Sequence, residues 1–162
     1  MSNPYESPLE AGVAAPPPDQ RGKVGQIRIV AILMMVQGGL ELLMGLFLLV
    51  MAVVLPMSLA ANAETRQMTT MIIAVYAVMG VGAIIAAVLH ALGGWKNYQL
   101  KSRQFGLISL IAGSVLSLAT CYCCPTAIGL MIYGLIVYMD GPVEAAFANR
   151  EAGGDVDKIL AR

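Results

Sequence analysis

The sequence predicts an all-α integral membrane protein, a four-helix bundle made of two transmembrane hairpins. Hydrophobic residues make up 58% of the 162 residues and charged residues only 12%. Soluble domains contain roughly half apolar and a quarter charged residues. The apolar residues also gather in long runs, and a proline divides the last run in two, which gives four helices.

The first helix is expected over residues 27–58. Its apolar part, Ile29 to Leu55, contains no basic residue and would be about 40 Å long, enough to cross a bilayer core of about 30 Å with some tilt. The Ala61-Asn62-Ala63 sequence that follows is similar to a signal-peptidase site. A signal peptide has an apolar region of only about 7–15 residues, so an uncleaved anchor is favoured.

The second helix is expected over residues 68–94, around an apolar run from Met71 to Ala91. Trp95 and Tyr98 follow it, where aromatic side chains commonly lie at the membrane interface. Gly93-Gly94 is expected to end or loosen this helix. His90, close to this end, is therefore expected at the inner interface.

The third apolar run, Phe105 to Met139, contains no charge and would be about 52 Å long as one helix. Pro125 fits the first turn of a new helix and fits a helix interior badly. Two helices are therefore expected, over residues 103–121 and 125–139, joined by a tight turn. Both are short for a full crossing, so a re-entrant hairpin remains an alternative.

Residues 26–141 thus form the transmembrane domain. Residues 1–25, rich in proline and poor in large aliphatic residues, are expected to form a disordered cytoplasmic tail. Residues 142–162 are expected to form a cytoplasmic tail with a short helix at the membrane surface. The basic residues predict this orientation, because they gather on one side with Arg66 alone on the other. That side carries Arg21, Lys23, Arg28, Lys96, Lys101, Arg103, Arg150, Lys158 and Arg162. The expected location is the cell (inner) membrane, multi-pass, with both termini in the cytoplasm.

Small and polar residues recur at helical spacing on three of the expected helices. Small residues allow helix backbones to approach, and hydroxyl groups can form hydrogen bonds across the contact. We expect these stripes to be packing faces, with the other apolar side chains facing lipid. The stripes are Gln37, Gly38, Glu41 and Gly45; Tyr76, Gly80, Ala83, Ala87 and His90; and Ser109, Gly113 and Ser117.

Glu41 is the only acid in the apolar run of the first expected helix, and it lies near the middle of that run. If each span is centred in the bilayer, Glu41 and Tyr133 lie near the midplane, whereas His90 lies about 13 Å to the cytoplasmic side. We therefore expect Tyr133 or Tyr76, and not His90, to bind Glu41. Glu41 fits either a proton or cation relay or a structural carboxyl that joins helices. The structural role is favoured, because no second acid or basic residue lies at that depth.

Cys121, Cys123 and Cys124 are expected at the outer surface. Thiolate ligands suit Cu(I), but the spacing of these cysteines matches no common zinc site. Inert thiols, or one disulfide, are therefore favoured, and neither a metal nor another cofactor is expected.

Two stretches resemble small uncharacterised membrane proteins of planctomycete-type bacteria. One is the Asn3-Pro4-Tyr5-Glu6-Ser7-Pro8 tail. The other is Arg103 to Phe147, with Cys123-Cys124-Pro125 at its turn and Pro142-Val143-Glu144-Ala145-Ala146-Phe147 at its end. The resemblance implies a C-terminal membrane hairpin and a bacterial origin. It implies no activity.

The function predicted from these observations is a non-enzymatic structural or interaction module that self-associates. Catalytic motifs are absent and the chain has a single histidine. The formal net charge of zero gives no support to nucleic-acid binding. The expected partners are the lipid bilayer and a second copy or another membrane protein. The alternatives are a small oligomeric transporter or channel that uses Glu41 and, less favoured, an outer-face metal or thiol-redox module.

Overall fold

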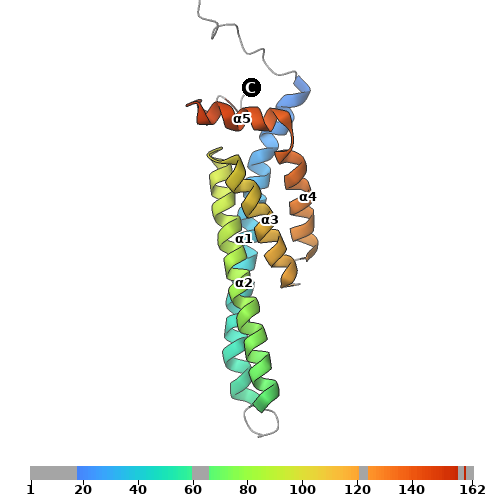
Figure 1. Cartoon of the computed structure of the whole chain (residues 1–162), viewed down its shortest axis with the longest axis vertical. Coiled ribbons are helices and arrows are strands. Elements are labelled where there is room, and N and C mark those ends of the chain that lie inside the picture. The colour runs from blue at the N-terminus through green and yellow to red at the C-terminus, as the bar shows by residue number, and fades with distance from the viewer. Residues whose placement is uncertain (1–17, 60–65, 121–123, 157–158, 160–162) are drawn as a thin grey trace, which may run out of the picture.

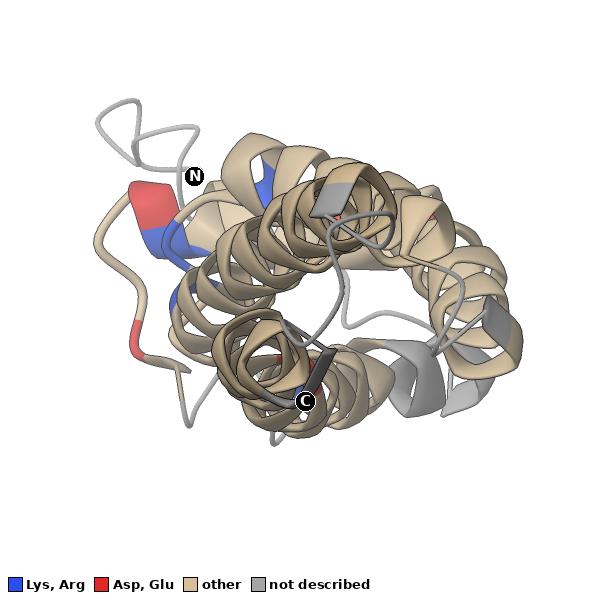
Figure 2. Ribbon diagram, turned by 90° about the horizontal axis from the view of Figure 1, so that it is seen from below, with Lys and Arg blue, Asp and Glu red and all other residues tan. Residues whose placement is uncertain are grey.

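The computed structural model describes residues 18–59, 66–120, 124–156 and 159. Within these residues the chain forms five helices and no strand. The all-α class expected from the sequence is therefore confirmed. Seen along the helices, most of the ribbon is uncharged (Figure 2).

The first two helices, α1 (Pro18–Leu59) and α2 (Arg66–Tyr98), form a long antiparallel hairpin. Helix α1 begins well before the expected residue 27, so residues 18–25 are helical and do not belong to a disordered tail. Proline at the first helical position fits, because the amide hydrogen it lacks would have no partner there. Residues 1–17 lie outside the described part of the chain.

Helix α2 continues through Gly93 and Gly94 to Tyr98, so the expectation that these glycines end it was wrong. Both glycines lie where another helix comes too close for a side chain. A Cβ on Gly94 would lie 2.7 Å from the carbonyl oxygen of Ala31, and a Cβ on Gly93 would lie 2.6 Å from Cβ of Ser109. Their role is close helix packing.

Two helical segments are long and apolar enough to cross a membrane: Val24–Met57 and Gln67–Tyr98. Their outward faces carry many exposed aliphatic side chains, as expected of lipid-facing helices. The described residues therefore support a membrane protein with two candidate spans.

Helices α3 (Arg103–Ala119) and α4 (Cys124–Tyr138) are shorter and cover only part of the long hairpin (Figure 1). Beyond them, α1 and α2 continue as a bare pair. A further span is possible only if α4 and α5, bent by 72° at their junction, are counted as one. The expected bundle of four full spans is thus not established.

Helix α5 (Gly141–Glu151) lies across one end of the bundle, as Figure 1 shows. Its buried side chains, Val143, Ala146 and Phe147, belong to the hydrophobic core at this end. Arg103 at the start of α3 donates to the carbonyl oxygen of Tyr138 from Nη2 (2.9 Å) and Nε (3.2 Å). Its Nη1 also lies 2.9 Å from Oε2 of Glu144, which ties α5 to the bundle.

Candidate functional site

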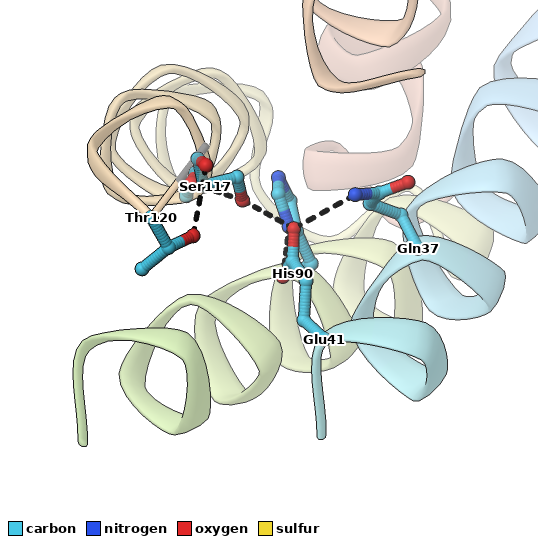
Figure 3. Close-up of polar contacts among 6 residues, drawn as sticks. Gln37, Glu41, His90, Ser117 and Thr120 are labelled. Carbon is cyan, nitrogen blue, oxygen red and sulfur yellow. Dashed lines mark hydrogen bonds and ion pairs between the residues drawn. The ribbon is translucent and has the colours of Figure 1, made fainter. Parts of the chain in front are cut away.

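Glu41, in the middle of α1, is the centre of a buried polar cluster between three helices (Figure 3). Only 3% of its surface is exposed, and His90 of α2 is fully buried. The His90 Nδ1 atom lies 2.8 Å from Oε2 of Glu41. A carboxyl group and an imidazole at this distance share a hydrogen bond, whichever of them holds the proton.

The second carboxyl oxygen, Oε1, has two further partners. Gln37, one turn away on α1, donates to it from Nε2 at 3.0 Å. The hydroxyl of Ser117 on α3 also hydrogen-bonds to it. Gln37, Glu41, His90 and Ser117 are called the Glu41 cluster below. It connects α1, α2 and α3, so three helices share one polar core.

The hydroxyl of Ser117 has two possible acceptors for its proton. It is 2.9 Å from the carbonyl oxygen of Gly113 as well as close to Glu41. A hydroxyl has a single proton to donate. If that proton goes to Gly113, Glu41 must donate to Ser117; if it goes to Glu41, Oε1 accepts. The cluster can therefore adopt either proton arrangement without moving a heavy atom.

The expectation that Glu41 and His90 lie too far apart to pair was wrong. It assumed that each helix is centred separately in the bilayer. Glycine contacts set a different register. A Cβ on Gly38 would lie 2.8 Å from the Ala87 carbonyl oxygen, and one on Gly45 would lie 3.0 Å from that of Gly80. In this register, the position on α2 that lies opposite Glu41 is about one helical turn from His90. The two long side chains can therefore meet.

The tyrosines that were expected to bind Glu41 lie elsewhere. Tyr133 packs against the hydrophobic core of the α5 end, and Tyr76 lies in the half of α2 that begins at Arg66. Among the described residues, no hydrogen bond joins either tyrosine to Glu41. Glu41 thus lies in a buried polar cluster that includes neither tyrosine.

The expected packing residues lie at helix contacts. Gly38, Gly45, Gly80, Ala83 and Ala87 lie between α1 and α2 or are buried beside that contact. On α3, Gly113 lies against the imidazole of His90: a Cβ there would be 2.6 Å from Nε2. Ser109 is fully buried opposite Gly93, and Ser117 belongs to the Glu41 cluster.

The cysteines cannot be placed in a site. Cys121 and Cys123 lie outside the described residues, and of Cys124 the structure describes only its backbone, at the start of α4. Elsewhere in the described ranges, no group of three or more histidine, cysteine or acidic side chains could hold a metal ion. The metal or redox alternative thus has no support from the residues seen here.

The sequence analysis missed Asn97, a second buried polar residue on α2. It is fully buried and donates from Nδ2 to the sulfur of Met34 at 3.5 Å. Asn97 follows His90 by two helical turns and so shares its face. This spacing could have identified it, but its polar neighbours indicated a loop. Tyr138, also buried, lies beside it.

Comparisons with protein-family models, curated proteins and solved structures give no match for this chain. The proposed function therefore rests on the contacts within this chain.

Proposed function

We propose that this chain is a non-enzymatic, multi-pass membrane protein with a structural or interaction role, in which the Glu41 cluster joins three helices. One observation carries the proposal: Glu41 is buried and has a partner from each of α1, α2 and α3. An ionisable group inside an apolar bundle is costly without partners. A set of mutually satisfied polar groups instead fixes one arrangement of the helices.

The proposed orientation has both termini in the cytoplasm of a bacterial inner membrane. Arg28, Lys96, Arg103 and Arg150 lie at the α5 end of the long hairpin, whereas Arg66 lies at the other end. Basic residues near span ends favour the cytoplasmic side. The amphipathic α5, with a buried apolar side and charged residues elsewhere, suits a membrane surface.

In this orientation, α3 and α4 form a re-entrant hairpin. A Cβ on Gly82 of α2 would lie 3.9 Å from Cγ2 of Thr120, the C-cap residue of α3. At 1.5 Å per residue, Gly82 is about 16 Å from Met71 and about 14 Å from Ala91, the ends of the apolar run. Thr120 is therefore near the middle of the membrane.

A chain that reverses direction in the middle of the membrane must be surrounded there by protein and not by lipid. Backbone groups at a helix end cannot be left facing lipid tails. A second copy, or another membrane protein, placed against α3 and α4 would provide that cover. This requirement supports the interaction role, with self-association as its simplest form.

The test has two measurements on the full-length protein. Its assembly size in detergent and in lipid nanodiscs should exceed that of a monomer. In liposomes it should carry no proton or cation flux. A strictly monomeric protein in lipid would contradict the proposed self-association. Flux that depends on Glu41 would overturn the proposed non-transport role.

Two substitutions of Glu41 test the structural role itself. Glu41→Gln keeps a polar group that can bind Gln37 and Ser117, so its free energy of unfolding should be close to that of the wild type. Glu41→Leu leaves His90 without its partner and should lose about 3–5 kcal/mol of stability, as when one member of a buried pair is removed. Equal stability of Glu41→Leu and wild type would contradict the role of the Glu41 cluster.

A small oligomeric transporter or channel remains the second candidate. The observation in its favour is that Glu41 and His90 form a buried pair of proton-binding groups at 2.8 Å. Ionisable groups inside a membrane domain often serve proton movement. Proton flux in wild-type liposomes that Glu41→Gln abolishes would establish it.

A further inference from the structure

A row of buried polar atoms without a protein partner runs from the Glu41 cluster toward α5. Among the described residues, Nε2 of His90, Oγ of Ser109 and Oδ1 of Asn97 make no hydrogen bond, and the hydroxyl of Tyr138 has only the side chain of Asn97 beside it. Each of these side chains is almost fully buried. Native proteins rarely leave such groups unsatisfied, and internal water is the usual partner.

These atoms share one contact, which we call the polar seam: the contact between α2 and α3 at His90, Ser109 and Asn97, together with Tyr138 of α4. Polar and small residues alternate across it. The imidazole of His90 faces Gly113, and the hydroxyl of Ser109 faces Gly93, where a Cβ would be 3.1 Å away. A Cβ on Gly106 would overlap the side-chain amide of Asn97. Each glycine therefore makes room for a polar group on the opposite helix.

The positions of the polar seam recur along α3 at short intervals. Ser109 lies about 6 Å from Gly113 along α3, and Gly106 lies about 4.5 Å beyond Ser109. One water molecule joins two polar atoms about 5–6 Å apart, because each of its hydrogen bonds is about 2.8 Å long. The intervals between these positions along the axis of α3 are therefore of the size that one water molecule bridges.

We propose that the polar seam binds a file of water molecules that connects the Glu41–His90 pair with the α5 end of the protein. In this file a hydronium ion gives its proton to Nε2 of His90 and becomes water, and the proton on Nδ1 passes to the Glu41 carboxylate at Oε2. The imidazole is neutral again after the transfer, with its proton now on Nε2, and Glu41 is protonated. The reverse transfers return the proton to water. The proposal goes beyond the structural role and does not depend on self-association.

The α5 end of the seam is covered by an apolar cap. Leu100, Tyr138 and Phe147 are buried there, and the rings of Tyr138 and Phe147 stack with centroids 6.2 Å apart. The ion pair between Arg103 and Glu144 holds this cap from outside. Exchange of the file with bulk water then requires the cap to open, so its rate depends on Phe147.

Few charged groups surround the seam among the described residues. On α1 and α2 they are Glu41 and His90 themselves, with Arg28 above the ring of Tyr98 and Lys96 above the ring of Phe105 at the α5 end. Arg103 of α3 and Glu144 of α5 lie outside the cap. Tyr133 and Tyr138 are the titratable groups of α4. The Glu41–His90 pair is therefore the acid–base centre that the file reaches.

The experiment uses the single histidine of the chain. Labelling the full-length protein with ¹⁵N-histidine reports on His90 alone. In lipid nanodiscs, magnetisation transfer from water to the proton on the His90 ring is measured by NMR. Wild type should show this transfer even though His90 is fully buried. Its absence in the wild-type protein would overturn the proposal, and this arm needs no substitution.

Substitutions then test the route. Ser109→Val and Asn97→Leu remove polar groups from the seam and should slow the exchange by about tenfold or more. Ser114→Val is the matched control, since Ser114 is equally buried and lacks a partner among the described residues, but is not a member of the seam. Phe147→Ala should speed the exchange. Equal slowing by Ser114→Val and Ser109→Val would contradict the route, as would exchange that is unchanged in both seam variants.

Folding of each variant is checked by circular dichroism and by elution volume. The proposed structural function can fail separately, since it is judged by assembly size and by the stability of the Glu41 variants. If the protein is monomeric and the ring proton of His90 exchanges with water, the water file is supported and self-association is contradicted.

Discussion

Gly38 lies so close to Ala87 that a Cβ on the glycine would be 2.8 Å from the alanine carbonyl oxygen. The backbones of α1 and α2 therefore touch, with no side chain between them. This contact sets which residues of the two helices lie opposite each other, and so allows Glu41 to reach His90.

Gly38→Ala should destabilise the protein by about 1–3 kcal/mol, because the added methyl group forces the two backbones apart. The neighbouring Gly39 is the control: a Cβ there meets nothing within 4 Å. Gly39→Ala should be neutral, or stabilise by up to about 1 kcal/mol through its better helix propensity. Unfolding in mixed micelles measures both. Similar losses in the two variants would rule out the backbone contact as the cause.

The Glu41–His90 pair should show energetic coupling. Glu41→Leu and His90→Leu each leave one member of a buried pair alone, whereas the double variant removes both. The double variant should therefore lose less stability than the sum of the single losses, by about 0.5–3 kcal/mol. Unfolding free energies of the wild type and the three variants complete the cycle. Strict additivity would mean that the pair does not interact in the membrane.

The re-entrant hairpin predicts which positions can be labelled from outside the cell. In a chain with Cys121, Cys123 and Cys124 changed to serine, Gln67→Cys should react with a membrane-impermeant maleimide in intact cells. Thr120→Cys should not react, because it lies near the middle of the bilayer. Labelling of both positions at the same rate would show that α3 and α4 cross the membrane completely.

The contacts of Arg103 predict unequal effects of two substitutions. Glu144→Gln removes an ion pair whose carboxylate side chain is 64% exposed, so the loss should be below about 1 kcal/mol and should shrink in high salt. Arg103→Ala also removes two hydrogen bonds to the Tyr138 carbonyl oxygen and should cost more, by about 1–3 kcal/mol. Thermal unfolding at low and high salt compares them. A larger loss for Glu144→Gln would contradict this assignment.

The sequence was informative about where helices occur, because long apolar runs and Pro125 mark them directly. The observed α3 and α4 begin and end within two residues of the expected bounds. The expected stripes also included Glu41, His90 and Ser117 from the candidate site. These features depend on local composition and helical spacing, which a single sequence contains.

The register between helices was not predictable in this way. It depends on which glycines of α1 meet which carbonyl groups of α2, and several pairings have similar spacing. Centring the spans gave Glu41 the wrong partner, Tyr133. Asn97 was missed for another reason, since a polar residue among lysines and aromatics is typical of a loop. Its burial depends on the contact of its side chain with Gly106 of α3, which the sequence does not reveal.

The limited reach of α3 and α4 has a consequence for the membrane around the protein. Near α5 the cross-section contains α1, α2, α3 and α4, whereas the far part contains α1 and α2 alone (Figure 1). In the proposed orientation, the molecule displaces more lipid from the inner leaflet than from the outer one. Its tapered shape then matches a bilayer that is bent, so that local curvature and lipid shape become part of the environment that stabilises the fold.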